Sequence, residues 1–133
     1  MGASISRPRV LIVDDDEESR CLLTEVLEAN GYAVEAVADC AAARAALTQN
    51  GEYRIVVADL RMPKESGLDL LRSLREQNSK LDMVLMSSFI SGKEKKAAEA
   101  LGVHALLEKP FRISDLLHTV AELVAKHPIG IST

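Results

Sequence analysis

Short, almost continuously apolar runs alternate along this chain with longer amphipathic segments. Residues 10–13 (VLIV), 55–58 (IVVA) and 83–86 (MVLM) contain no charged or hydroxyl side chain. Such runs are typical of strands that are buried on both faces. Residues 32–37 (YAVEAV) alternate more strongly, as expected nearer the edge of a sheet, and residues 105–107 (ALL) complete a set of five predicted strands. Strands of this kind need helices over both faces of their sheet.

The segments between the apolar runs are predicted to be helical. In the first of them, residues 17–30, one face carries Cys21, Leu23, Val26 and Leu27. The other predicted helices are 41–49 after an Asp39 cap, 67–77 after a Ser66 cap, 93–101, and a last helix that Ser114 caps and Pro128 closes. Every predicted strand is therefore followed by a predicted helix.

Five strand–helix units joined by connections of a few residues predict a parallel sheet with right-handed crossovers. The predicted fold class is α/β, an open, doubly wound sheet of five parallel strands with helices on both faces. A length of 133 residues suits one domain. We place that domain at residues 9–126, between an N-terminal tail (1–8) and a C-terminal tail (127–133).

The composition excludes several classes of protein. The formal net charge of −4 argues against direct contact with nucleic acid, because phosphate-binding surfaces show a basic excess. No apolar run approaches the ~18 residues of a membrane span, and the N-terminus lacks the apolar segment of a secretory signal, so we expect no membrane contact. Cys21 and Cys40 form neither a disulfide framework nor a metal motif, which favours buried free thiols and a cytoplasmic location.

Polar side chains follow four of the five predicted strands. Residues 14–16 (DDD) follow the first strand, Asp59 follows the third, Ser87 follows the fourth, and Lys109 comes shortly after the fifth. Ligands of open α/β sheets bind beyond the carboxyl ends of the strands, so these side chains can converge. Clustered carboxylates repel one another unless a cation lies among them, and oxygen ligands without Cys or His suit Mg²⁺.

Residues 14–16 alone are also explained as the cap of the following helix. Asp59 has no such explanation, because the next predicted helix does not begin until about Ser66.

Carboxylates, Mg²⁺, one amine and one hydroxyl suit phosphoryl transfer, which depends on positioning and charge neutralisation. Asp59 would attack phosphorus and become an aspartyl phosphate, while Asp14 and Asp15 hold the metal. Lys109 and the Ser87 hydroxyl would contact the phosphoryl oxygens. The chain has no Walker-type or G-x-G-x-x-G motif, so we expect the donor to be a partner protein or a small phosphodonor rather than a nucleotide.

The set of motifs resembles the receiver domain of two-component response regulators over about residues 8–126. The resemblance rests on the acidic pair after the first strand, DLRMP at 59–63 with Gly67, the serine pair at 87–88, and KPF at 109–111. It implies a flavodoxin-like (βα)₅ fold, and Mg²⁺ as cofactor. It also implies a cis peptide bond before Pro110, an option specific to proline.

The same resemblance implies a role for each site residue. Asp59 is the phosphoacceptor, and Asp15, Asp59 and the backbone carbonyl of Arg61 bind Mg²⁺ directly. Asp14 binds the metal through water, and Asp16 caps the helix. Ser87 and Lys109 complete the catalytic set.

Two positions depart from the commonest pattern of the family. Leu106 stands where the resemblance implies a Tyr or Phe that moves inward on phosphorylation, so the usual readout is absent there. Phe89 and Arg61 occupy positions that influence dephosphorylation in this family. We weigh two interpretations of Phe89: its ring shields the phosphoryl group from water, or it packs on the nearby loop.

The resemblance implies a signalling switch that catalyses only its own phosphorylation and dephosphorylation. The expected donor is a histidine kinase or a His-phosphotransfer protein. The expected recipient is an output domain or protein that binds the surface formed by residues 93–126, and a homodimer is a further option. Three settings stay open: a stand-alone receiver, a phosphorelay intermediate, or the receiver portion of a longer transcription factor or hybrid kinase. Five units and two tails leave no room for an output domain within these residues.

Two other functional classes compete with this interpretation. A phosphorylation-independent interaction or dimerisation module of the same fold is favoured by Leu106 and opposed by the intact set of carboxylates, hydroxyl and amine. A phosphatase with an aspartate nucleophile would need a second acid two residues after that nucleophile, where this chain has Arg61.

Overall fold

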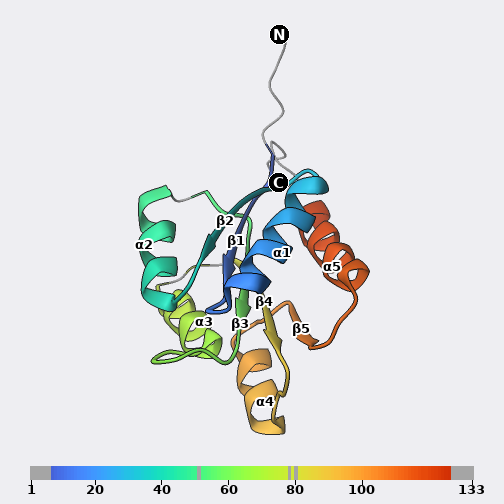
Figure 1. Ribbon diagram of the computed structural model, residues 1–133. Helices are drawn as coiled ribbons and strands as arrows, with labels where there is room; N and C mark the ends of the chain where they lie inside the picture. Colours follow the sequence, from blue (N-terminus) through green and yellow to red (C-terminus); the bar gives the residue numbers. More distant parts are fainter. Residues whose placement is uncertain (1–6, 51, 78, 80, 127–133) are drawn as a thin grey trace.

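The computed structural model describes residues 7–50, 52–77, 79 and 81–126. Strands and helices alternate without exception along this part of the chain (Figure 1). The strands are β1 (Arg9–Val13), β2 (Ala33–Val37), β3 (Ile55–Asp59), β4 (Asp82–Ser87) and β5 (Ala105–Glu108). The helices are α1 (Glu17–Ala29), α2 (Cys40–Asn50), α3 (Gly67–Glu76), α4 (Gly92–Ala100) and α5 (Ile113–Lys126). The predicted order of elements is confirmed.

The five strands form one parallel sheet in the order β2-β1-β3-β4-β5. The three fully apolar runs became the three central strands, and every residue of β3 and β4 is buried. The segment that alternated more strongly became β2, at one edge, and the shortest run became β5, at the other. The predicted doubly wound α/β fold is confirmed.

Alternate residues of the central strands enter two separate hydrophobic clusters. Val10, Ile12 and Ile55 belong to the cluster beneath α1 and α5. Leu11, Val13 and Val56 belong to the cluster beneath α2, α3 and α4. Figure 1 shows the corresponding layers, with α1 and α5 on one side of the sheet and α2 and α3 on the other. Because helices cover both faces of the sheet, the central strands need apolar residues on both faces.

Helix caps define where most of the helices begin. Asp16 and Ser66 accept hydrogen bonds from the third residues of α1 and α3, and Asp39 accepts one from Ala42, as predicted. The α4 cap is Ser91, whose hydroxyl and the Glu94 carboxylate form a capping box. The prediction that Ser114 caps the last helix is wrong, because α5 already begins at Ile113 and its first turn bonds to the Arg112 carbonyl.

The prediction that both thiols are buried is wrong for Cys21. Cys40, the first residue of α2, is buried, whereas Cys21 is exposed on α1. Leu23 and Leu27 are four residues apart and form the buried stripe of α1. Cys21 is two residues before Leu23, which rotates it to the opposite side of the helix.

None of the helices in the described part of the chain combines the length and the apolar character that a bilayer span requires. The predicted tails at 1–8 and 127–133, and the Pro128 stop, lie almost wholly outside the described residues, which begin at Arg7 and end at Lys126.

Candidate functional site

Three carboxylates converge at the carboxyl ends of β1 and β3. Asp14 and Asp15 follow β1, and Asp59 is the last residue of β3. One carboxylate oxygen from each lies within 4.8 Å of the others. Because β1 and β3 are neighbours in the sheet, residues 44 positions apart in the sequence meet at this edge. The structure thus brings together the acidic residues that the sequence singled out.

Asp14 lies in an unfavourable environment for a carboxylate. It has no exposed surface, and burial above all, with a smaller effect from nearby acids such as Asp59, raises its pKa above the usual value. The Asp16 amide donates to its Oδ1 atom at 3.0 Å. Its buried Oδ2 accepts no hydrogen bond from any of the described residues. A buried acceptor without a hydrogen bond, among other carboxylates, fits a hard cation such as Mg²⁺.

Lys109 provides the positive charge of the cluster. Its Nζ atom lies 3.2 Å from Oδ2 of Asp59 and 3.6 Å from Oδ2 of Asp14. The Lys109 amide donates to the Ser87 carbonyl, which anchors the loop after β5 to the end of β4. The peptide bond between Lys109 and Pro110 is cis, as predicted. The ammonium thus contacts two of the three carboxylates.

The Ser87 hydroxyl is buried at the end of β4 and makes local contacts. It donates to the Phe89 carbonyl at 2.8 Å and accepts from the Phe89 amide at 3.2 Å. Phe89 itself is 61% exposed, so most of the residue is open to solvent. The Arg61 guanidinium carbon lies 6.0 Å from the centre of that ring.

The side chains of two arginines, Arg20 and Arg61, make contacts around this site that the sequence did not predict. Arg20 of α1 donates to the Asp14 carbonyl at 2.7 Å, which ties the acidic loop to the helix that follows it. Arg61 binds both carboxylate oxygens of Glu94 at 2.6 and 2.7 Å. Each contact joins two different elements of the fold and depends on the conformation of a long side chain, which the sequence does not show. Only the position of Arg20, one turn into α1, could have suggested its role.

The side chain of Leu106 lies away from the acidic cluster. Leu106 is partly buried and packs against the hydrophobic cluster beneath α2, α3 and α4. It pairs with Leu85 across β4 and β5. The position therefore contributes aliphatic packing and no ring or hydroxyl.

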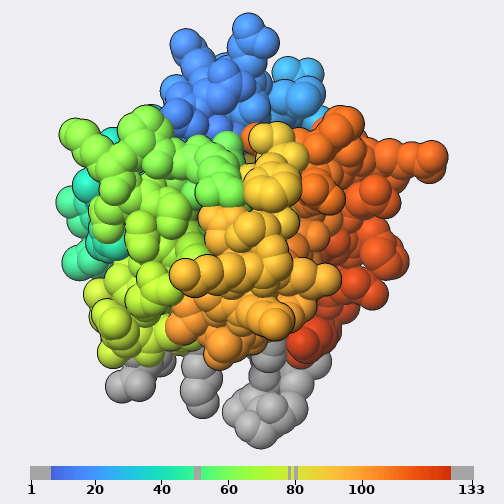
Figure 2. Space-filling view, turned by 90° about the horizontal axis from the view of Figure 1, so that it is seen from below, coloured from blue at the N-terminus to red at the C-terminus, as the bar shows by residue number. Residues whose placement is uncertain are grey.

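Figure 2 shows the face on which the site lies, with the loops after β1, β3, β4 and β5 meeting in blue, green, yellow and orange.

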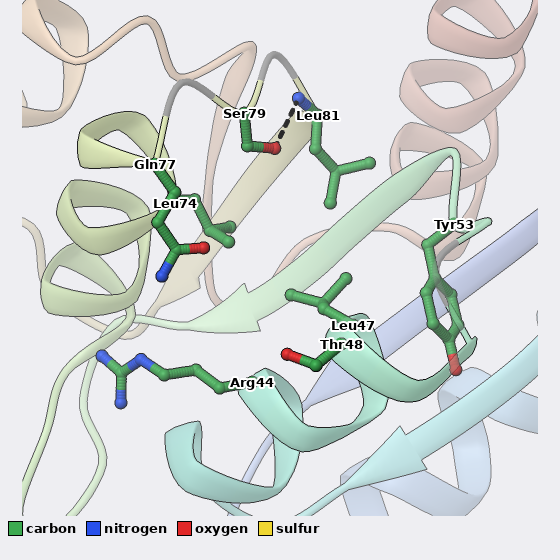
Figure 3. A pocket seen from close by; sticks show the side chains of 8 residues that line it. All are labelled: Arg44, Leu47, Thr48, Tyr53, Leu74, Gln77, Ser79 and Leu81. Carbon is green, nitrogen blue, oxygen red and sulfur yellow. Dashed lines mark hydrogen bonds between the residues drawn. The ribbon is translucent and has the colours of Figure 1, made fainter.

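A separate hollow of about 500 Å³ lies between α2 and α3, beside the amino ends of β3 and β4 (Figure 3). Its lining includes Arg44, Tyr53 and Leu74 and none of the acidic cluster. The chemistry-bearing residues are thus gathered at the opposite edge of the sheet.

Comparison with known proteins gives one consistent family. A family model described as "Response regulator receiver domain" matches residues 10–121. "Protein PetR" of Rhodobacter capsulatus is 36% identical over 131 residues, which cover 97% of this chain and 54% of PetR. "Response regulator MprA" of a Mycobacterium species is 34% identical over 118 residues, covering 89% of this chain and 51% of MprA. The chain thus spans about half the length of these two relatives.

Solved structures agree with the sequence comparison. The receiver domain of the Francisella response regulator 1452 superposes with a TM-score of 0.84 and 30% sequence identity, covering 90% of this chain and 98% of that one. A response regulator receiver domain protein, described as CheY-like, from Methanospirillum hungatei superposes with a TM-score of 0.85 and 26% identity. That match covers 91% of this chain and 96% of the other.

Proposed function

The chain belongs to the response regulator receiver domain family, and from that premise we propose that it accepts a phosphoryl group on Asp59 and thereby changes its affinity for a partner. The observation that carries this proposal is the arrangement of Asp14, Asp15 and Asp59 within 4.8 Å, with the Lys109 ammonium 3.2 Å from Asp59. The domain that does this is proposed to span residues 9–126.

We assign the metal to the acidic cluster. Asp15, Asp59 and the backbone carbonyl of Arg61 would bind Mg²⁺, and Asp14 would bind through water. The Oδ2 atom of Asp14, which is buried and accepts no hydrogen bond from the described residues, supports this assignment. Bound Mg²⁺ would neutralise negative charge on the phosphoryl oxygens, a requirement of phosphoryl transfer.

The remaining steps use the side chains of this protein. A carboxylate oxygen of Asp59 attacks phosphorus, the bond from phosphorus to a histidine nitrogen of the donor breaks, and that nitrogen keeps the electron pair. Lys109 neutralises the phosphoryl oxygens from the β5 side. The Ser87 hydroxyl, one strand away from Asp59, donates to one of those oxygens.

The proposed donor is a histidine kinase or a His-phosphotransfer protein, because the chain has no nucleotide-binding motif. The proposed recipient is an output domain or protein that binds the surface formed by residues 93–126. Relatives of about twice this length favour a receiver portion of a larger regulator as the setting. The proposal treats the chain as a signalling domain of the cytoplasm rather than as an enzyme with a separate substrate.

The test is labelling with a small phosphodonor. The wild-type protein and the Asp59→Asn variant are incubated with acetyl phosphate and Mg²⁺ and separated on a gel that retards phosphoproteins. We expect one hydroxylamine-sensitive phosphoryl group on the wild type, none on Asp59→Asn, and full labelling of Asp115→Asn, which changes an exposed aspartate of α5. Equal and persistent labelling of Asp59→Asn would contradict the assignment. A partner that binds equally with and without the acyl phosphate would instead favour the phosphorylation-independent module.

A further inference from the structure

Arg61, Phe89 and Glu94 form a connected group, here called the Arg61 clasp, at the side of the proposed phosphorylation site. Arg61 binds the two carboxylate oxygens of Glu94 at 2.6 and 2.7 Å, a bidentate geometry. The same guanidinium donates to the Phe89 carbonyl at 3.2 Å. The clasp therefore ties the loop after β3 both to the loop after β4 and to the first turn of α4.

The clasp shares one acceptor with the Ser87 hydroxyl. The Phe89 carbonyl accepts from Ser87 at 2.8 Å as well as from Arg61. A serine hydroxyl has one hydrogen to donate. Ser87 can therefore donate either to Phe89 or to a phosphoryl oxygen on Asp59, and it cannot do both.

Glu94 holds the clasp rigidly because its carboxylate is itself positioned. Its Oε1 atom accepts from the Ser91 amide at 3.1 Å, and its own amide donates to the Ser91 hydroxyl at 3.1 Å. The Glu94 side chain is only 23% exposed, whereas that of Arg61 is 49% exposed. The carboxylate is thus the fixed end of the pair, and the guanidinium is held by it.

We propose that Glu94 is a positioning residue that acts through Arg61. By binding Arg61, Glu94 holds the Phe89 carbonyl in place as the acceptor of the Ser87 hydroxyl before phosphorylation. The hydroxyl is thereby restrained from turning to Asp59. This inference rests on the proposed phosphorylation of Asp59. When the Ser87 hydroxyl donates to the phosphoryl group instead, the Phe89 carbonyl keeps only the hydrogen bond from Arg61 among the side-chain donors of the described residues. The clasp then rearranges, and the first turn of α4 senses the state of Asp59.

The test compares Glu94→Gln with Glu99→Gln. The Glu94→Gln side chain keeps an oxygen that accepts from Ser91, so the cap persists, but it loses the charge that pairs with Arg61. Glu99 is an exposed residue of the same helix, and its side chain forms no hydrogen bond or ion pair with the described residues. With acetyl phosphate and Mg²⁺, we expect Asp59 of Glu94→Gln to be phosphorylated about two- to fivefold faster than in the wild type, the range for a partly exposed ion pair. Glu99→Gln should match the wild type.

A second measurement separates this role from general loosening of α4. Amide NMR resonances of Ser91, residue 94 and Lys95 are recorded for each variant before and after phosphorylation. In Glu94→Gln they should start displaced toward their phosphorylated positions, and adding Arg61→Gln should cause little further displacement, because the two changes break the same pair.

The outcomes are distinct. Absence of labelling in every protein would overturn the proposed function itself. Labelling of the wild type and of Glu94→Gln at equal rates, with unchanged α4 resonances, would overturn the role of Glu94 alone.

Discussion

The first residue of α3, Gly67, lies against the main chain of Asp59. A β-carbon at Gly67 would come within 2.6 Å of the Asp59 carbonyl oxygen and 2.9 Å of a Leu85 methyl group. The backbone that carries the proposed phosphoacceptor thus packs directly on the start of a helix. This contact requires glycine for lack of space, and not for its freedom of conformation.

We therefore predict that Gly67→Ala lowers the free energy of unfolding by about 1–3 kcal/mol, the usual cost of overpacking. Gly92→Ala is the matched control, because it also begins a helix and a β-carbon there meets nothing within 4 Å. Urea denaturation of both variants measures the difference. A stability of Gly67→Ala equal to that of Gly92→Ala would contradict the close approach.

Lys64, in the loop before α3, adopts a left-handed backbone conformation with φ of 71°. This conformation costs a residue with a β-carbon about 1–2 kcal/mol, and glycine avoids that cost at an entropic cost of about 0.5–1 kcal/mol. We predict that Lys64→Gly stabilises the protein by about 0.5–1 kcal/mol in urea denaturation. Lys64→Ala keeps the strain and should give no gain, so an equal gain in both variants would point to the lost charge instead.

The fold could be predicted because each local pattern agreed with the global arrangement. In the runs at β1, β3 and β4, the residues that point to either face of the sheet are apolar. Only strands that are covered on both faces require this pattern. The convergence of Asp14, Asp59 and Lys109 followed from topology alone, since parallel strands end at one edge. Their actual distances, and the burial of Asp14, needed the structure.

Other features depend on packing that a linear pattern does not contain. Nothing in the sequence marks the left-handed conformation of Lys64, and the pairing of Arg61 with Glu94 joins residues 33 positions apart. The start of α4 differs by one residue from the prediction, although Ser91 and Glu94 carry the spacing of a capping box. Cys21 does not share the buried face of Leu23 and Leu27, because a residue two positions away points to the opposite side of a helix.

Asp14 is predicted to reduce the stability of the metal-free protein. Burial raises its pKa in the folded state, so the folded state binds this proton more tightly than the unfolded state does. The stability of the wild type should therefore fall as pH rises above the usual value of 3.8 and through the folded pKa. In EDTA, Asp14→Asn should melt at a higher temperature than the wild type at pH 7, and the difference should shrink toward pH 4. A pH-independent difference would contradict this explanation.

Mg²⁺ is predicted to stabilise the wild-type protein, because a ligand that binds only the folded state adds free energy of unfolding. The gain is about 2.7 kcal/mol when free Mg²⁺ is about 100 times its dissociation constant. Thermal melts in MgCl₂ and in EDTA, at equal ionic strength, measure it. Asp15→Asn should lose most of the gain, and Asp115→Asn, an exposed change outside the acidic cluster, should keep it. An equal Mg²⁺ effect in both variants would place the cation elsewhere.

The two thiols are predicted to react at very different rates in the folded protein. Cys21 is exposed, whereas Cys40 is buried, and that burial raises the pKa of Cys40 to about 11. Because the thiolate is the reactive form, iodoacetamide at pH 8 should alkylate Cys21 and leave Cys40 unmodified until the protein unfolds. Peptide mass spectrometry after timed quenching assigns each modification. Cys21→Ser should therefore resist alkylation in buffer and react in urea, and rapid alkylation of this variant in buffer would show that Cys40 is accessible in the folded state.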